Sequence, residues 1–278
     1  MEAQPNATIS WVQSYKASSQ VGFLDLPREL RDYVYGFAFR VHGAIFIYSP
    51  NPYAVRPIAK AMIVRHKGYG PVEPQPLGNI IPMALMRTCY QLHAECSAVL
   101  YGENVFRIWF LSDTELTLAY RQLVRHISLT AEVDHRVFGS SLEEVSYGWK
   151  RRFWPTIITN STSMLERFPS LETLTFPLKP PRHGELWRPA FFAVEHKTRA
   201  QRVALAANWM KPRCPFENER QRQCLQLELV PSSRQQKVSL DEYKGSRFAP
   251  EEDEDEDMEQ EWDCTEFTDA FELMKSFR

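Results

Sequence analysis

Three side chains that could bind a metal ion lie close together in the sequence. Cys89, His93 and Cys96 are spaced at i, i+4 and i+7, so one face of a helix could present all three to a zinc ion. No fourth ligand has a suitable spacing nearby. We therefore expect two core cysteines and a boundary histidine, and the sequence predicts no metal or other cofactor.

A second segment combines bases with aromatic rings. Residues 149–154 (WKRRFW) could contact phosphates and stack on bases. On a helix, however, Trp149 and Phe153 would face inward while Lys150 and Arg151 point to solvent. The pattern indicates core aromatics beside exposed bases, and it does not favour nucleic acid as a partner.

The sequence contains none of the common catalytic motifs. It has no Gly-x-Ser-x-Gly elbow, no phosphate-binding Gly-x-x-x-x-Gly-Lys loop, no Gly-x-Gly-x-x-Gly and no His-Glu-x-x-His. The neighbouring carboxylates of Glu143 and Glu144 would point in different directions from a helix, so they do not form an acid-base pair. We predict that the protein is not an enzyme.

The secondary structure expected around these residues alternates between helix and strand. Apolar spacing predicts helices near 27–39, 83–101, 112–122, 141–165 and 188–208 and a strand at 44–48. Four further segments, 105–110, 124–129, 171–176 and 224–229, share the apolar pattern of a leucine-rich-repeat strand but lack a regular repeat length. The alternation favours parallel strands. We predict an α+β or α/β fold with an irregular, leucine-rich-repeat-like strand-helix layer.

Composition divides the chain into five regions. We expect a disordered arm at 1–20, a helical region at 21–104 with a Pro-rich insertion at 49–82, and an irregular strand-helix body at 105–230. An acidic disordered linker at 231–260 contains seven consecutive acids, Glu251–Asp257. An amphipathic helix at 261–278 follows, and its stripe of Phe267, Phe271 and Met274 should dock on the body.

The charges are distributed unevenly along the chain. Residues 251–278 hold 13 of the 35 acidic residues but only two of the 33 basic ones, so residues 1–250 carry a formal charge of +9. A basic body beside an acidic tail suggests either charge masking or a solubilising tail.

The sequence also bears on the compartment. Five scattered cysteines imply no disulfide framework, and apolar runs such as residues 44–48 are much shorter than the roughly 18 residues of a membrane helix. The first 20 residues lack the apolar core of a secretory signal. We expect a cytoplasmic or nuclear protein with no membrane contact.

Two blocks of the sequence resemble a known family. Residues 26–35 (LPRELRDYVY) resemble the opening of an F-box. Residues 85–95 (LMRTCYQLHAE) and 99–106 (VLYGENVF) are similar to the second conserved block of an F-box-like family abundant in filamentous fungi. The resemblance implies F-box-like helices packed on the strand-helix layer. In the second block it is carried by Arg87, Thr88, Cys89, Gln91, Glu95, Tyr101, Asn104 and Phe106.

The resemblance also implies a partner. The corresponding face of an F-box contacts the adaptor subunit of cullin-RING (SCF-type) ubiquitin ligases, which here would involve Leu26, Pro27, Leu30, Val34 and Tyr35. The leading hypothesis is a ligase substrate receptor with an unknown protein target. A protein-interaction or scaffold module with no ligase link, in which these residues are only core, is the main alternative. A nucleic-acid-associated protein that uses the +9 body is a third.

Overall fold

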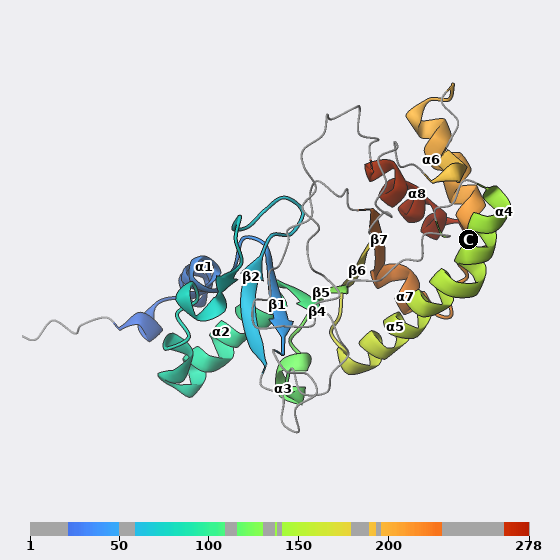
Figure 1. Cartoon of the computed structure of the whole chain (residues 1–278). Helices are drawn as coiled ribbons and strands as arrows, with labels where there is room; N and C mark the ends of the chain where they lie inside the picture. Colours follow the sequence, from blue (N-terminus) through green and yellow to red (C-terminus); the bar gives the residue numbers. More distant parts are fainter. Residues whose placement is uncertain are drawn as a thin grey trace, which may run out of the picture.

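The computed structural model describes residues 22–49, 59–108, 116–129, 137, 141–178, 189–192, 196–229 and 264–277. The predicted arm at 1–20 and the predicted acidic linker at 231–260 lie outside these residues. Figure 1 shows α1 and α2 beside one end of a central sheet, with α4 to α8 gathered at the other end around β6 and β7.

Within the described residues, a seven-stranded mixed sheet has the order β3-β2-β1-β4-β5-β6-β7. Five strands, β1, β4, β5, β6 and β7, run parallel to one another. In contrast, β2 pairs antiparallel with both β1 and β3. The predicted α+β or α/β class is confirmed, and the four segments with the shared apolar pattern supply four successive strands. The strands are β1 (Ala44–Tyr48), β2 (Lys60–Val64), β3 (Gln75–Pro76), β4 (Val105–Ile108), β5 (His126–Leu129), β6 (Thr173–Leu178) and β7 (Leu225–Leu229).

The helices connect the strands and cover the sheet. None of the described helices is both long and apolar enough to span a membrane. The α-helices are α1 (Arg28–Phe39), α2 (Tyr90–Gly102), α3 (Leu118–Arg121), α4 (Leu142–Gly148), α5 (Trp154–Arg167), α6 (Arg199–Met210), α7 (Glu219–Cys224) and α8 (Thr265–Ser276). Shorter turns are η1 (Phe23–Asp25), η2 (Leu77–Asn79), η3 (Leu85–Arg87), the π-helical η5 (Trp149–Phe153) and η6 (Ala190–Phe192).

Part of the predicted Pro-rich insertion at 49–82 forms a strand. Lys60–Val64 forms β2, whose Ile63 lies opposite Ile45 of β1, so part of this segment extends the sheet. The two predicted regions 21–104 and 105–230 also share this sheet, because β1 pairs with β4. Helices predicted at 83–101 and 188–208 begin later, at Tyr90 and Arg199.

The main core lies on one face of the sheet. Alternate strand residues such as Ile45, Phe106, Ile127, Leu174 and Leu227 pack there against the helices. The other face of the first strands carries a small separate cluster around Phe46 and Val64. The core therefore fixes the inward face of each helix, and the outward faces determine what a partner can contact.

Candidate functional site

The outward face of α1 is apolar. Leu30, Tyr33, Val34 and Phe37 follow the i, i+3, i+4, i+7 spacing of one helical face, and they are 53%, 67%, 41% and 74% exposed. The rings of Tyr33 and Phe37 pack edge to face with their centroids 4.8 Å apart. We call these four residues the α1 stripe. A contiguous exposed apolar surface of this kind is typical of an interaction site.

The inward face of α1 carries Arg31, Tyr35 and Phe39, which are all buried. Tyr35 is fully buried, so its predicted place among the adaptor-binding residues is wrong. Adjacent helical residues are about 100° apart, and Val34 and Tyr35 therefore cannot share a face. Tyr35 belongs to the contact between α1 and α2.

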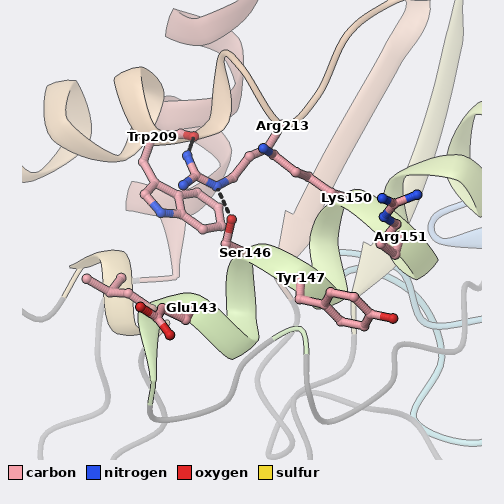
Figure 2. A pocket seen from close by; sticks show the side chains of 8 residues that line it. Glu143, Ser146, Tyr147, Lys150, Arg151, Trp209 and Arg213 are labelled. Carbon is pink, nitrogen blue, oxygen red and sulfur yellow. Dashed lines mark hydrogen bonds between the residues drawn. The ribbon is translucent and has the colours of Figure 1, made fainter.

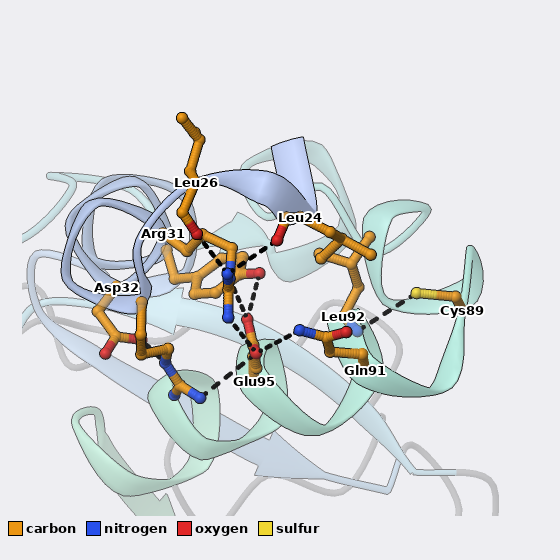
Figure 3. Close-up of polar contacts among 10 residues, drawn as sticks. Leu24, Leu26, Arg31, Asp32, Cys89, Gln91, Leu92 and Glu95 are labelled. Atoms are coloured by element: carbon orange, nitrogen blue, oxygen red, sulfur yellow. Dashed lines mark hydrogen bonds and ion pairs between the residues drawn. The ribbon is translucent and has the colours of Figure 1, made fainter. Parts of the chain in front are cut away.

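A buried polar cluster joins α1 to α2. The guanidinium of Arg31 donates to both carboxylate oxygens of Glu95, with Nε to Oε2 at 3.0 Å and Nη2 to Oε1 at 2.9 Å. The hydroxyl of Tyr35 donates to Glu95 Oε2 at 2.8 Å, and Nε2 of Gln91 donates to Oε1 at 3.1 Å. Figure 3 shows Arg31 and Gln91 pointing toward Glu95. We call Arg31, Tyr35, Gln91 and Glu95 the Glu95 cluster.

The hydrogen bonds within the Glu95 cluster favour the ionised form of Glu95. The hydrogen bond from Arg31 is the main cause that lowers the pKa of Glu95 to about 2. The same hydrogen bond raises the pKa of Arg31, while burial and the neighbouring carboxylate raise the pKa of Tyr35. Charge-assisted bidentate pairing of this type fixes geometry as well as energy. The cluster therefore sets the orientation of α1, and with it the direction of the α1 stripe.

The chain that precedes α1 is fixed by the same arginine. Nη1 of Arg31 donates to the carbonyl oxygens of Leu24 at 3.1 Å and Leu26 at 2.5 Å. Leu26 is partly buried and Pro27 is exposed as the N-cap of α1. Of the five predicted adaptor-binding residues, Pro27, Leu30 and Val34 are thus exposed and Leu26 is partly exposed.

The residues of the second sequence block mostly join elements together. Asn104 is buried, accepts from the backbone N–H of Val41 at 2.8 Å and donates to the carbonyl oxygens of Phe39 and Leu100. The Tyr101 ring stacks on both Phe106 and Tyr120. Asn104 thereby ties the end of α1 to the end of α2.

The start of the same block shapes the first turn of α2. Thr88 Oγ1 donates to the carbonyl of Leu85 at 2.8 Å, and the Sγ of Cys89 accepts from the N–H of Leu92 as the N-cap. Arg87, the last residue of η3, is exposed. Gln91 and Glu95 belong to the Glu95 cluster. Most of the block therefore holds α1, α2 and β4 in place.

The three residues of the hypothetical zinc site make other contacts. His93 Nδ1 lies 2.9 Å from the carbonyl of Met86 and Nε2 lies 3.0 Å from the Tyr120 hydroxyl. Cys89 is exposed as the N-cap of α2, so the prediction that it is a core cysteine is wrong. Cys96 is buried, and burial raises the pKa of its thiol to about 11. Within the described ranges, no group of three or more histidine, cysteine or acidic side chains could hold a metal ion.

The aromatic and basic residues of segment 149–154 separate as expected. Trp149, Phe153 and Trp154 are buried, and the indole N–H of Trp149 donates to the carbonyl of Val137 at 2.9 Å. Lys150, Arg151 and Arg152 are exposed. The rings therefore serve the core, and only the bases can contact a ligand.

The tail helix α8 is docked on the body. Phe267, Phe271 and Met274 are buried, with Phe271 beside Trp154 and Phe216. Glu266 is 2% exposed and accepts from Arg202 of α6, with Nε to Oε2 at 3.0 Å. Lys275 donates to the carbonyl of Leu225 on β7 at 2.9 Å. The acidic run Glu251–Asp257, predicted to lie over the basic body, is outside the described residues.

Two parts of the candidate site were not predicted from the sequence. Tyr33 and Phe37 complete the α1 stripe, and their i, i+3, i+4, i+7 spacing from Leu30 was the signal for it. Arg31 and Glu95 are the other part. Glu95 interrupts an apolar face between Leu92 and Cys96, which could have marked it as a buried, paired charge.

Comparisons with known proteins were made for the whole chain. They found no match: no protein-family model, no curated protein and no solved structure is significantly similar to it.

Proposed function

We propose that this chain is an F-box-like protein-interaction protein in which the α1 stripe binds the adaptor subunit of a cullin-RING (SCF-type) ubiquitin ligase. The strand-helix body would then bind the target protein. The observation that carries the proposal is the exposure of the α1 stripe on a helix whose opposite face is fully packed.

The α1 stripe is better suited to a partner than to the core of its own chain. A helix usually buries its apolar face, and burying a large apolar side chain contributes about 1.5–3 kcal/mol. In α1 the buried face instead includes Arg31 and Tyr35, whose polar atoms are bound to Glu95. A partner with an apolar groove would gain the energy that the isolated chain leaves unused.

The Glu95 cluster supports binding by fixing α1 before a partner arrives. Arg31 connects α1 to α2 through Glu95 and to the preceding chain through the carbonyls of Leu24 and Leu26. A surface that is already ordered loses less conformational entropy on binding. Residues of both sequence blocks therefore serve one purpose, which is to present the α1 stripe.

The proposal is tested by co-purification with an isolated SCF adaptor. Leu30→Glu and Phe37→Glu change exposed side chains, so the far-UV circular dichroism should stay that of the wild type while adaptor binding is lost. Leu118→Glu is a matched control because Leu118 is a 68% exposed leucine on α3, away from the α1 stripe. The control should bind like the wild type.

The opposite results would identify the alternative. If the wild type fails to bind the adaptor, the chain is an interaction module with no ligase link. If Leu118→Glu weakens binding as much as Leu30→Glu does, the contact is not made by the α1 stripe.

A further inference from the structure

A surface pocket lies between α4 and α6, remote in sequence from α1. It has a cavity volume of about 530 Å³. Its lining includes Leu142 and Tyr147 of α4, Lys150 and Arg151 of η5, Trp209 of α6 and Arg213, which follows α6. Figure 2 shows these elements converging, with Arg213 beside Trp209 and the bases of η5 to one side. The proposed adaptor contact does not involve this pocket.

The pocket has an apolar part. Leu142 and Tyr147 are 52% and 59% exposed, although both are large apolar side chains. Trp209 is partly buried and supplies a third apolar surface. Concave apolar surfaces with a few oriented polar groups are typical of binding sites. An apolar side chain of a ligand would therefore find contacts here.

The pocket is also lined by three cations, Lys150, Arg151 and Arg213. Among the described residues, no carboxylate lies within ion-pair distance of Lys150, Arg151 or Arg213, although Glu143 also contributes to the lining. Burial lowers the pKa of Arg213, so solvent compensates its charge only in part. Charge complementarity favours an anionic ligand.

Arg213 is held in a fixed orientation at the pocket wall. Its Nε donates to Ser146 Oγ at 2.9 Å, its Nη1 donates to the carbonyl of Trp209 at 2.6 Å, and its guanidinium lies 4.1 Å from the centroid of the Trp209 ring. Its Nη2 makes no hydrogen bond within the described part of the chain. A fixed guanidinium with an unused donor is well prepared to bind a carboxylate.

We propose that this pocket binds an acidic peptide segment of a target protein. An apolar side chain of the peptide enters between Leu142, Tyr147 and Trp209, and neighbouring carboxylates pair with Lys150, Arg151 and Arg213. The inference rests on the proposed function in one respect, namely that the chain is a receptor for another protein.

An acidic peptide fits the pocket better than a nucleic acid does. Proteins that bind single strands use a continuous basic groove along the phosphate backbone together with stacked aromatic rings. Here Glu143 lies in the pocket lining, so negative charge interrupts the basic surface. The rings of Trp149 and Phe153 face the core and cannot stack on bases.

The test is fluorescence anisotropy on the full chain. The probe is a fluorescein-labelled peptide with a central leucine flanked by runs of glutamate, and the control peptide has glutamine in place of every glutamate. We expect the glutamate peptide to bind, its affinity to fall as salt is raised, and the glutamine peptide to bind at least about tenfold more weakly.

Matched variants localise the binding. Lys150→Glu and Arg151→Glu should each weaken binding by about tenfold or more, whereas Arg152→Glu, a neighbouring exposed base that does not line the pocket, should change it by less than about threefold. Tyr147→Ser should also weaken binding without a change in circular dichroism, because its side chain is largely exposed. Equal effects of all three charge reversals would overturn the proposal.

Two competing occupants give distinct results. If a single-stranded DNA oligonucleotide displaces the peptide more effectively than unlabelled peptide does, the surface is a nucleic-acid site and the proposal is wrong. If neutralising Glu251–Asp257 raises the peptide affinity about tenfold or more, the chain's own acidic run is the occupant, and the proposal of a partner peptide is wrong. Failure to bind the peptide at low salt would also overturn it. None of these results would alter adaptor binding by the α1 stripe.

Discussion

Two helix pairs at opposite ends of the sheet are built on the same design. In the pair α1 and α2, the bidentate contact of Arg31 with the buried Glu95 crosses between the helices. In the pair α6 and α8, Arg202 makes the same bidentate contact with the buried Glu266. Buried ion pairs of this kind contribute more to the choice of one geometry than to net stability.

The two pairs differ in whether the apolar stripe of one helix is buried or exposed. The α8 residues Phe267, Phe271 and Met274 are buried among aromatic rings of the body. The α1 stripe is exposed although its spacing on the helix is similar. Similar spacing thus gives a buried stripe in α8 and an exposed stripe in α1. The α8 stripe is therefore part of the core, whereas the α1 stripe is left exposed for the adaptor contact proposed above.

The largest expected effect on stability comes from truncating a core ring of α8. Phe271→Ala removes a fully buried side chain that packs beside Trp154 and Phe216. A cavity of this kind should lower the free energy of unfolding by about 3–5 kcal/mol, which urea denaturation measures. A loss below about 1 kcal/mol would mean that α8 is only loosely docked.

The next effect concerns the ion pair that orients α1. Glu95→Ala leaves the buried charge of Arg31 without its counter-ion and should lower the free energy of unfolding by about 3 kcal/mol. The matched control is Glu103→Ala, which removes the exposed ion pair between Arg40 at the end of α1 and Glu103 at the end of α2. It should cost less than about 1 kcal/mol. Equal losses in urea denaturation would show that the Glu95 cluster is not buried as described.

The Glu95 cluster also predicts a dependence of stability on pH. The pKa of Glu95 is about 2 in the folded chain against an ordinary value of 4.5, so protons bind more tightly to the unfolded state. The contribution of the pair is fully present above about pH 4.5 and is lost as the pH falls towards 2. The groups around Glu95 are Arg28, Arg31, Tyr35 and Gln91.

Glu95→Gln isolates this contribution. Urea denaturation between about pH 5 and about pH 2.5 should give a shallower loss of stability in the variant than in the wild type, because the neutral amide that replaces the carboxylate takes up no proton in this range. Parallel curves for the two proteins would contradict the lowered pKa of Glu95.

The comparison of the two helices also shows what periodicity can predict. The segments around Ile108, Ile127, Leu174 and Leu227 became neighbouring strands because their alternate residues face one core. Periodicity also identified both amphipathic helices. It could not tell which apolar stripe is covered, since that depends on elements distant in the sequence such as Trp154, which packs on α8.

Other features could not be predicted from the local sequence. β2 lies within a Pro-rich segment, and its strand character comes from pairing with β1, a tertiary contact. Tyr35 was assigned to the surface because the resemblance treats it as a pair with Val34, although the two residues point to different sides of α1. The pairing of Arg31 with Glu95 could not be predicted, because charged residues are usually solvated and the two residues lie 64 positions apart in the sequence.

The smallest expected effect on stability comes from the matching truncation in the α1 stripe, Phe37→Ala. Phe37→Ala truncates a phenylalanine that is 74% exposed, so the free energy of unfolding should change by less than about 0.5 kcal/mol. The same urea denaturation measures it. A loss approaching that of Phe271→Ala would mean that the α1 stripe is packed against the chain itself, and the contrast between the two helices would disappear.

Isothermal titration of the chain with a purified SCF adaptor tests the central claim most directly. If the α1 stripe is the contact surface, binding should be micromolar or tighter, with a negative heat-capacity change because apolar surface is buried. Phe37→Ala should bind at least about tenfold more weakly despite its unchanged stability, whereas Leu118→Ala, which truncates an exposed leucine on α3, should bind like the wild type. Absence of binding by the wild type, or equal affinity of the wild type and Phe37→Ala, would contradict the account.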